Sequence, residues 1–190
     1  MRTHLSDLRI DYDGSQLRSG WLAGTFALAP DAEGAMVAFV GGCDVKPEFV
    51  VDLEEAASGE PIRAALMLHF IAEFPERDLE KAVLRQRLLA AVVRDELAAR
   101  LAGKRRKIVR RGDDLYDGKH KLSVSVATLS PNSALLHFGL DVDPAGAPVP
   151  ARGLAGYGVE PRELAQAVLS AYAAETCSVR AAAAKVRFVE

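Results

Sequence analysis

RRGDDLYDGKHKLSVSVATLSPNSALLHFGLDVD, from Arg110 to Asp143, is the stretch that decides the fold. Asp117-Gly118 predicts a two-residue hairpin turn, because both central positions of such a turn need positive φ. Beyond the turn, apolar residues alternate with polar or small ones on both sides of a break at residues 130–133. We therefore expect three consecutive strands, the first of which includes Ile108-Val109.

The alternation also predicts which polar side chains share a face. Successive side chains in a strand point to opposite faces. If the two strands after the turn pair over one core, their polar faces must coincide. Lys121, Ser123, Ser125 and His137 would then lie on one face, with Asp141 further along the strand that carries His137.

Length and composition indicate one globular domain that spans residues 1–190. The apolar content of 49% supports a substantial core, and the net charge of −2 gives no general attraction to nucleic acid or to a membrane. The two cysteines, Cys43 and Cys177, are too few and too far apart for a disulfide framework or a zinc site. The N-terminus has no apolar signal segment. We therefore expect a cytoplasmic protein that does not associate with membranes.

Two amphipathic helices are expected. The first begins at Asp78, a favourable N-cap, and ends before Gly103. Its apolar stripe comprises Leu79, Val83, Ala90, Val93 and Leu97, widened by Leu84 and Leu88. The second begins near Pro161, since proline is favoured at the first helical position.

Further strands are expected at Trp21–Ala29, at Met36–Val40 and at Leu68–Phe74, the last with Leu68, Phe70 and Ala72 inward. Residues 185–190 alternate and predict a closing edge strand, which could pair with another chain in a homodimer. Because strands and helices do not alternate regularly, the fold class is α+β, with a mostly antiparallel sheet and two main packed helices.

Lys121 is the first candidate for chemistry. A lysine among small polar residues could hold a carboxylate or phosphate, or stabilise charge that develops on a transferred acyl group. A solvated lysine on an edge strand is the structural alternative. His137 could act as a general acid or base, although a histidine in an apolar run is more often a core residue.

Three other motifs have both a functional and a structural interpretation. Gly41-Gly42, followed by Asp44, could expose backbone N–H groups to a ligand, or could form a bulge. Asp113-Asp114 could hold Mg²⁺ with nucleotide phosphates, or could be a polar turn; no metal site is predicted. The basic run at 104–111 could bind RNA, but we favour a solvated strand and expect no nucleic-acid partner.

Over nearly its full length the chain resembles an uncharacterised prokaryotic family, domain-of-unknown-function family 366. The matching stretches are DYDGSQLR (11–18), GGCDV (41–45), VDLE (51–54), LHFI (68–71), DLEKAVLRQRLL (78–89), RRGDDLY (110–116), KHKLSVSVAT (119–128) and HFGLDVD (137–143). The family name carries no activity.

More remotely, the chain is similar to the catalytic domain of biotin and lipoate protein ligases, which is related to class II aminoacyl-tRNA synthetases. The order of motifs carries this resemblance: Gly41-Gly42, then Asp113-Asp114-Leu115, then residues 118–123, then 137–140. It implies that Lys121 matches the ligases' catalytic lysine. Val124 and Phe138 depart from the ligase motifs, which counts against biotin or lipoate as the substrate and leaves open a pocket for some other small acid, with or without ATP.

Two functions follow as expectations. The first is a ligase- or acyltransferase-like enzyme that acts on an activated small carboxylic acid, with ATP and Mg²⁺ as candidate cofactors. Lys121 would be catalytic, and the substrate or nucleotide would contact Gly41, Gly42, Asp44, Asp114, Ser123, Ser125 and His137. The alternative is a non-catalytic module that binds a nucleotide or small acid.

Overall fold

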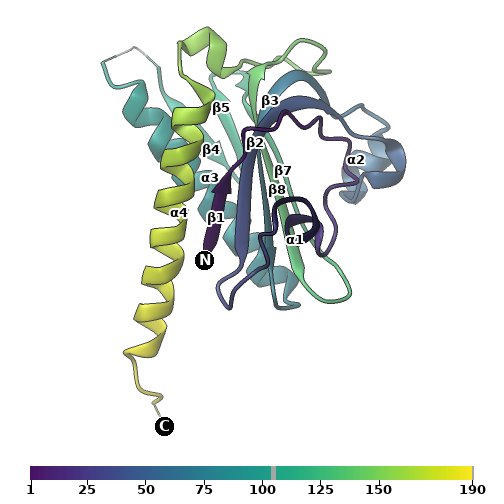
Figure 1. The fold of residues 1–190 in the computed structure, drawn as a ribbon. Coiled ribbons are helices and arrows are strands. Elements are labelled where there is room, and N and C mark those ends of the chain that lie inside the picture. Colours follow the sequence, from purple (N-terminus) through teal and green to yellow (C-terminus); the bar gives the residue numbers. More distant parts are fainter. Residues whose placement is uncertain (104–105, 190) are drawn as a thin grey trace.

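A five-stranded mixed sheet forms the centre of the molecule (Figure 1). The structure is a computed structural model that describes residues 1–103 and 106–189. The strand order is β1-β2-β3-β8-β7, in which β1 is parallel to β2 and the other neighbours are antiparallel. The strands are β1 (Arg2–Leu5), β2 (Ala35–Asp44), β3 (Arg63–Phe74), β8 (Ala134–Asp143) and β7 (Ser123–Leu129). The expected α+β class is confirmed.

A second, three-stranded sheet comes from the stretch that was expected to form a hairpin. It consists of β4 (Ile108–Arg111), β5 (Asp114–Asp117) and β6 (His120–Lys121). Gly118 adopts a φ of 62° between β5 and β6, as the turn prediction requires. The chain then leaves this small sheet at Leu122 and enters the large one at Ser123. The stretch therefore contains more strands than the three predicted.

Helices cover one face of the large sheet, and the N-terminal segment covers much of the other (Figure 1). The helical side holds α3 (Leu79–Arg100) and α4 (Pro161–Ala184), which pack on a core that includes Phe70, Phe138 and Leu140. On the opposite side, α1 (Trp21–Phe26) and the preceding segment pack on a second core. The short elements α2 (Leu53–Ser58), η1 (Pro47–Phe49) and η2 (Leu154–Tyr157) lie in the connections.

The two long helices begin where their capping residues predict. The Asp78 carboxylate accepts from the Lys81 N–H at 2.9 Å at the start of α3. Pro161 is the first residue of α4, after a Glu160 cap. The predicted apolar stripe of α3 is partly wrong, because Leu79 and Leu84 are exposed and the buried residues include Gln86 and Leu89. Its buried face is therefore rotated relative to the predicted one.

Two predicted strands are wrong. Residues 21–26 form a helix, because Gly20 and Ala27 adopt left-handed φ values of 76° and 54° on either side of it. The Glu73 carboxylate accepts from the Gly20 N–H and the Ser19 hydroxyl at this helix start. Residues 185–189 form no strand; Glu190 lies outside the described residues. The edge of the sheet beside β2 is instead β1.

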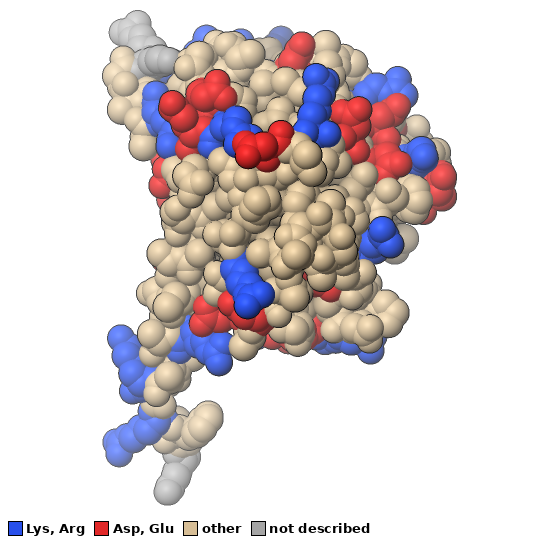
Figure 2. Space-filling model, in the orientation of Figure 1, with Lys and Arg blue, Asp and Glu red and all other residues tan. Residues whose placement is uncertain are grey.

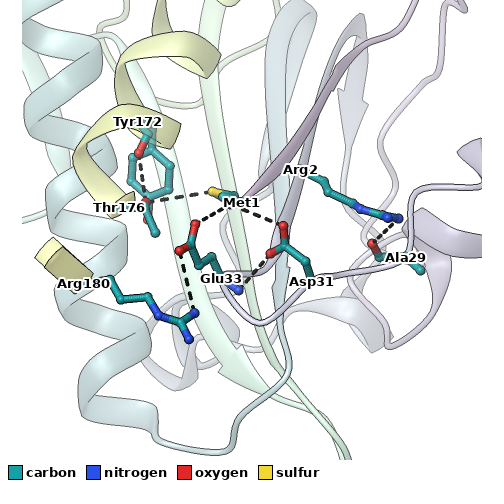
Figure 3. Close-up of polar contacts among 8 residues, drawn as sticks. All are labelled: Met1, Arg2, Ala29, Asp31, Glu33, Tyr172, Thr176 and Arg180. Carbon is teal, nitrogen blue, oxygen red and sulfur yellow. Dashed lines mark hydrogen bonds and ion pairs between the residues drawn. The ribbon is translucent and has the colours of Figure 1, made fainter. Parts of the chain in front are cut away.

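The N-terminus is tied to the turn before β2 and to α4 (Figure 3). The Met1 ammonium lies 2.6 Å from Glu33 and 3.4 Å from Asp31. Glu33 also lies 3.7 Å from Arg180 of α4, and the Thr176 hydroxyl contacts the Met1 sulfur. These contacts hold β1 between β2 and α4. None of the described helices is both long and apolar enough to cross a membrane.

Candidate functional site

A cavity of about 140 Å³ opens where β2, β3 and β8 approach the junction between the two sheets. The loop after β8 covers one side and the segment after α2 covers another. The lining residues that carry polar side chains are Cys43, Glu55, Glu60, Arg63, Lys121, Ser123 and Asp141. The remaining lining is mostly apolar: Pro61, Ile62, Met67, Val124, Ala147, Pro148, Val149 and Ala151.

Backbone hydrogen bonds fix Lys121 at this cavity. Its N–H donates to the Pro150 carbonyl at 2.9 Å, and its own carbonyl accepts from the Arg152 N–H at 3.0 Å. The loop that covers the cavity is therefore attached to the strand that supplies the lysine. The lysine side chain reaches the cavity from the small sheet, whereas most other lining residues belong to the large sheet or to loops.

The Lys121 ammonium forms an ion pair with Asp114 of β5, at 2.9 Å from the carboxylate. Burial opposes the charged lysine, but the hydrogen bond and charge of Asp114 outweigh it and raise the pKa of Lys121. Burial raises the pKa of Asp114, against the influence of the lysine. Lys121 is therefore cationic at neutral pH, and Asp114 orients it without lining the cavity itself.

Asp141 of β8 is the least exposed carboxylate of the cavity, at 7% of its full exposure. Its N–H donates to the Leu122 carbonyl at 2.8 Å, which fixes the strand beside the junction. Within the described part of the chain, its carboxylate has no hydrogen-bond or ion-pair partner. Burial raises its pKa to about 7, and the nearby positive charge of Lys121 partly opposes that rise.

Cys43 lies opposite, on β2, and is a neutral thiol at physiological pH. Burial raises its pKa to about 12, and the charges of Asp141 and Asp44 add to that effect. Its sulfur contacts the Ile62 carbonyl at 3.8 Å. A thiol in this state packs as a small apolar group and is a poor nucleophile.

The predicted common face for Lys121, Ser123, Ser125 and His137 is wrong. In the register of β7 with β8, Ser123 is opposite Leu140 and Ser125 is opposite Phe138, so both serines share the helical face. His137 belongs to the other face, with Asp141. The prediction failed because it assumed that the apolar sides of both strands pack on one core. Val124 of β7 instead packs on the second core, whereas Phe138 and Leu140 of β8 belong to the helical core. Lys121 lies in the small sheet.

The two serines satisfy local hydrogen bonds. The Ser123 hydroxyl lines the cavity and accepts from the Leu115 N–H at 2.9 Å, which joins the two sheets. The Ser125 hydroxyl donates to Asp113 at 2.9 Å and accepts from Gln86 of α3 at 2.8 Å. Gln86 also donates to Asp113 at 2.9 Å, so these three side chains form a closed set away from the cavity.

His137 is buried in an aromatic cluster under the second core. Its Nε2 lies 3.0 Å from Nδ1 of His69, and its ring stacks on Tyr12 with centroids 3.8 Å apart. Burial lowers the pKa of His69 to about 4 and places the pKa of His137 well below its ordinary value. Both rings are therefore neutral at physiological pH, and His137 lines a smaller hollow of about 30 Å³ beside the cavity.

Gly41 and Gly42 lie against the N-terminal segment. A β-carbon on Gly41 would lie 2.5 Å from the Ile10 carbonyl carbon, so the close approach of that backbone explains the glycine. Gly42 donates its N–H to the Asp11 carboxylate at 2.7 Å and, with Asp44, lines an open hollow of about 300 Å³ beside the cavity. Asp44 forms an exposed ion pair with Arg63 at 3.0 Å.

The acidic pair 113–114 does not fit a magnesium site. Asp113 is held by Gln86 and Ser125, whereas Asp114 is held by Lys121, so the two carboxylates serve separate partners. Among the described residues, no group of three or more histidine, cysteine or carboxylate side chains could hold a metal ion. Of the basic run 104–111, residues 104 and 105 lie outside the described residues. On the face drawn in Figure 2, basic and acidic residues intermingle.

Sequence reasoning missed most of the cavity. It selected Lys121 and Ser123, but not Cys43, Glu55 or the loop at residues 147–151. It placed Asp141 on a polar face without selecting it. The alternation of His137, Gly139 and Asp141 in an otherwise apolar strand was the available signal, because a buried charge is rare without a function or a partner.

Comparison with known proteins assigns nearly the whole chain to one family. Residues 1–187 match the family described as "Domain of unknown function (DUF366)". The uncharacterized protein MJ0805 of Methanocaldococcus jannaschii is 33% identical over 144 residues, which span 73% of this chain and only 62% of that relative's length. A solved protein of unknown function from Pyrococcus horikoshi is 36% identical with a TM-score of 0.90, and the match covers 100% of this chain and 99% of that one.

Solved structures described as biotin or lipoate ligases are more distant in sequence. The biotin protein ligase of Aquifex aeolicus, in complex with biotin and ATP, is 13% identical with a TM-score of 0.59, over 92% of this chain and 70% of that one. Protein Ta0514 of T. acidophilum, with bound lipoic acid, is 15% identical with a TM-score of 0.52, over 94% and 87%. At these identities the likeness shows the fold alone. This chain therefore belongs to the DUF366 family, and its fold is similar to that of the biotin and lipoate protein ligases.

Proposed function

We propose that the chain is a ligase- or acyltransferase-like enzyme that acts on an activated small carboxylic acid, with Lys121 as its catalytic cation. One observation carries the proposal: a half-buried ammonium lines a cavity of about 140 Å³ and is held there by Asp114. A cation that is oriented before the ligand arrives can bind a carboxylate and stabilise the charge that develops during acyl transfer.

The other residues of the cavity have supporting roles. Asp114 is a positioning residue, because it contacts the ammonium and not the cavity. Arg63 lines the cavity and two hollows beside it, so its guanidinium could neutralise phosphate groups that extend outward from the acid. ATP would supply the activation of the acid. The Aquifex ligase, which has a similar fold, is solved with both biotin and ATP.

Size limits the acid that the cavity encloses. A cavity of about 150 Å³ holds a molecule such as benzene, whereas pockets for drug-sized ligands measure roughly 300–1,000 Å³. The volume of about 140 Å³ therefore favours an acid smaller than biotin or lipoate. This agrees with the departures from the ligase motifs at Val124 and Phe138.

The test is acid-dependent exchange of pyrophosphate with ATP by the full chain, which reports formation of the acyl-adenylate and release of its pyrophosphate leaving group, for a panel of small carboxylic acids, biotin and lipoate. We expect Lys121→Met to lower the rate roughly 100-fold or more, because it removes the charge that the site provides. Lys119→Met is the matched control, since Lys119 is exposed on the adjacent turn. Equal rates in the two variants would contradict the role of Lys121.

A non-catalytic binding module is the second candidate, since an oriented ammonium suffices to bind an acid and the Cys43 thiol of the cavity is a poor nucleophile. This alternative predicts that small acids bind to the wild type and less well to Lys121→Met, without any pyrophosphate exchange. Isothermal titration calorimetry beside the exchange assay separates the two functions.

A further inference from the structure

We propose that the cavity takes a small amino acid with an apolar side chain, whose ammonium group pairs with Asp141. The inference deepens the proposed function and rests on it for the carboxylate, which Lys121 would hold. The requirement for an amine comes from Asp141 alone and has a separate test.

Burial of the Asp141 side chain costs free energy unless a partner compensates for its lost hydration. Asp141 lies on β8, which is hydrogen-bonded to β3 on one side and β7 on the other, and it is 93% buried, since its exposure is 7%. Buried carboxylates normally have a charged or hydrogen-bonding partner. Among the described residues the Asp141 carboxylate has no hydrogen bond or ion pair, only the nearby charge of Lys121, and Asp141 lines the cavity. A ligand group is the partner that the arrangement lacks.

The neighbours of Asp141 exclude the obvious internal partners. The Lys121 ammonium is 2.9 Å from Asp114, to which it is bonded. Arg63 pairs with Asp44 at 3.0 Å. The Cys43 thiol contacts the Ile62 carbonyl. The missing group must therefore be a donor that enters with the ligand.

The charge balance of the cavity indicates which kind of donor would pair with Asp141. The acidic residues that line the cavity are Glu55, Glu60 and Asp141, against two cations, Lys121 and Arg63. Both cations already have carboxylate partners. A ligand ammonium would bring the positive charge that Asp141 needs and would form a charge-assisted hydrogen bond. A ligand that carried only a carboxylate would leave Asp141 unpaired.

The other lining residues indicate what kind of side chain the amino-acid ligand would carry. Ile62, Met67, Val124 and the loop residues Pro148 and Val149 offer apolar contacts. The volume of about 140 Å³ limits the enclosed ligand to about the size of benzene, which an amino acid such as valine approaches. A carboxylate beside Lys121, an ammonium beside Asp141 and a small apolar side chain together describe that class.

Three related ligands test the inference on the full chain by calorimetry: valine, 3-methylbutanoate, which lacks the amine, and isobutylamine, which lacks the carboxylate. Alanine and leucine extend the panel. The variant is Asp141→Asn, which keeps the shape and removes the charge; its folding is checked by circular dichroism and thermal melting. We expect one or more of the amino acids to bind the wild type roughly tenfold to hundredfold more tightly than the Asn variant. 3-Methylbutanoate should bind both proteins equally and weakly.

The outcomes separate this inference from the proposed function. If 3-methylbutanoate binds the wild type as tightly as valine, and binding depends on Lys121, the acid site stands and the amine requirement is overturned. If isobutylamine binds through Asp141 while no acid depends on Lys121, the Asp141 site stands and the proposed function fails. If no amino acid binds the folded wild type, or if Asp141→Asn leaves the affinities unchanged, the amino-acid proposal is wrong.

Discussion

Replacing Gly41 with alanine should separate the N-terminal segment from β2. The new β-carbon would lie 2.5 Å from the Ile10 carbonyl carbon, nearer still to its oxygen, and 3.1 Å from the Asp11 nitrogen. Real β-carbons essentially never approach a heavy atom within 3.0 Å, and these neighbours are backbone atoms that cannot rotate away. Either the segment or the strand must therefore move.

The expected loss of stability in Gly41→Ala depends on which atoms clash. Overpacking a well-packed site costs typically 1–3 kcal/mol, and we expect about 3 kcal/mol here because backbone must shift. For a domain of this length, that free energy of unfolding corresponds to a fall in melting temperature of roughly 6–12 °C. Urea denaturation and thermal melting, each followed by circular dichroism, measure the two quantities.

Gly42→Ala is the matched control in the adjacent residue. Its β-carbon would lie 3.2 Å from a side-chain oxygen of Asp11 and 3.6 Å from the Ala65 carbonyl, which small rotations can accommodate. Neither glycine has positive φ, so alanine adds no backbone strain at either position. We expect Gly42→Ala to change stability by less than about 1 kcal/mol. Equal effects of the two substitutions would refute the reasoning that backbone proximity requires Gly41.

Three further predictions concern buried polar groups. Burial raises the pKa of Asp141 from 3.8 to about 7, so the folded protein binds its proton more tightly and stability should fall as pH rises from about 4 to 7. Asp141→Asn should gain about 2–4 kcal/mol over the wild type across that window in urea denaturation; parallel pH profiles would contradict this. The variant is needed because His69, whose pKa burial lowers to about 4, gives the opposite slope. Ser125→Ala should lower the free energy of unfolding by about 1 kcal/mol in the same assay, because the hydrogen bond between Gln86 and Asp113 remains. Ligand affinity should not change. A loss of binding would place Ser125 in the site. Glu73→Ala should cost about 3 kcal/mol, since it leaves the Gly20 N–H and the Ser19 and Ser133 hydroxyls without their acceptor; a cost below about 1 kcal/mol would show that water replaces the carboxylate.

Local signals predicted the elements that depend on a single residue or a long apolar pattern. The Asp78 cap fixed the start of α3, Pro161 that of α4, and Gly118 the hairpin between β5 and β6. The inward set Leu68, Phe70 and Ala72 was also correct. Each of these signals acts over a few residues, which is why the sequence shows it.

Elements that depend on distant partners were not predictable in the same way. The helix at 21–26 depends on the Glu73 carboxylate, 53 residues from Gly20. The edge strand β1 depends on its parallel pairing with β2, which no local pattern reports. Likewise the cavity combines residues of five strands, the helix α2 and two connecting segments, so only Lys121 and Ser123 could be selected from one contiguous motif.

The two sides of the cavity should differ in how readily they open. Asp141 lies on β8, whose residues from Ala134 to Val142 are all buried. Residues 134–140 of this strand pair with both β3 and β7, and the Asp141 N–H donates to the Leu122 carbonyl, so these amide hydrogens should exchange only by global unfolding. Lys121 belongs to a two-residue strand attached to a loop in which Val149 is 47% exposed, and such segments open locally at much lower free energy. A small molecule can therefore enter and leave by a brief opening of the lysine side, while the aspartate that would recognise it stays in place. Slower exchange at the Lys121 and Arg152 amides would then report an occupied cavity.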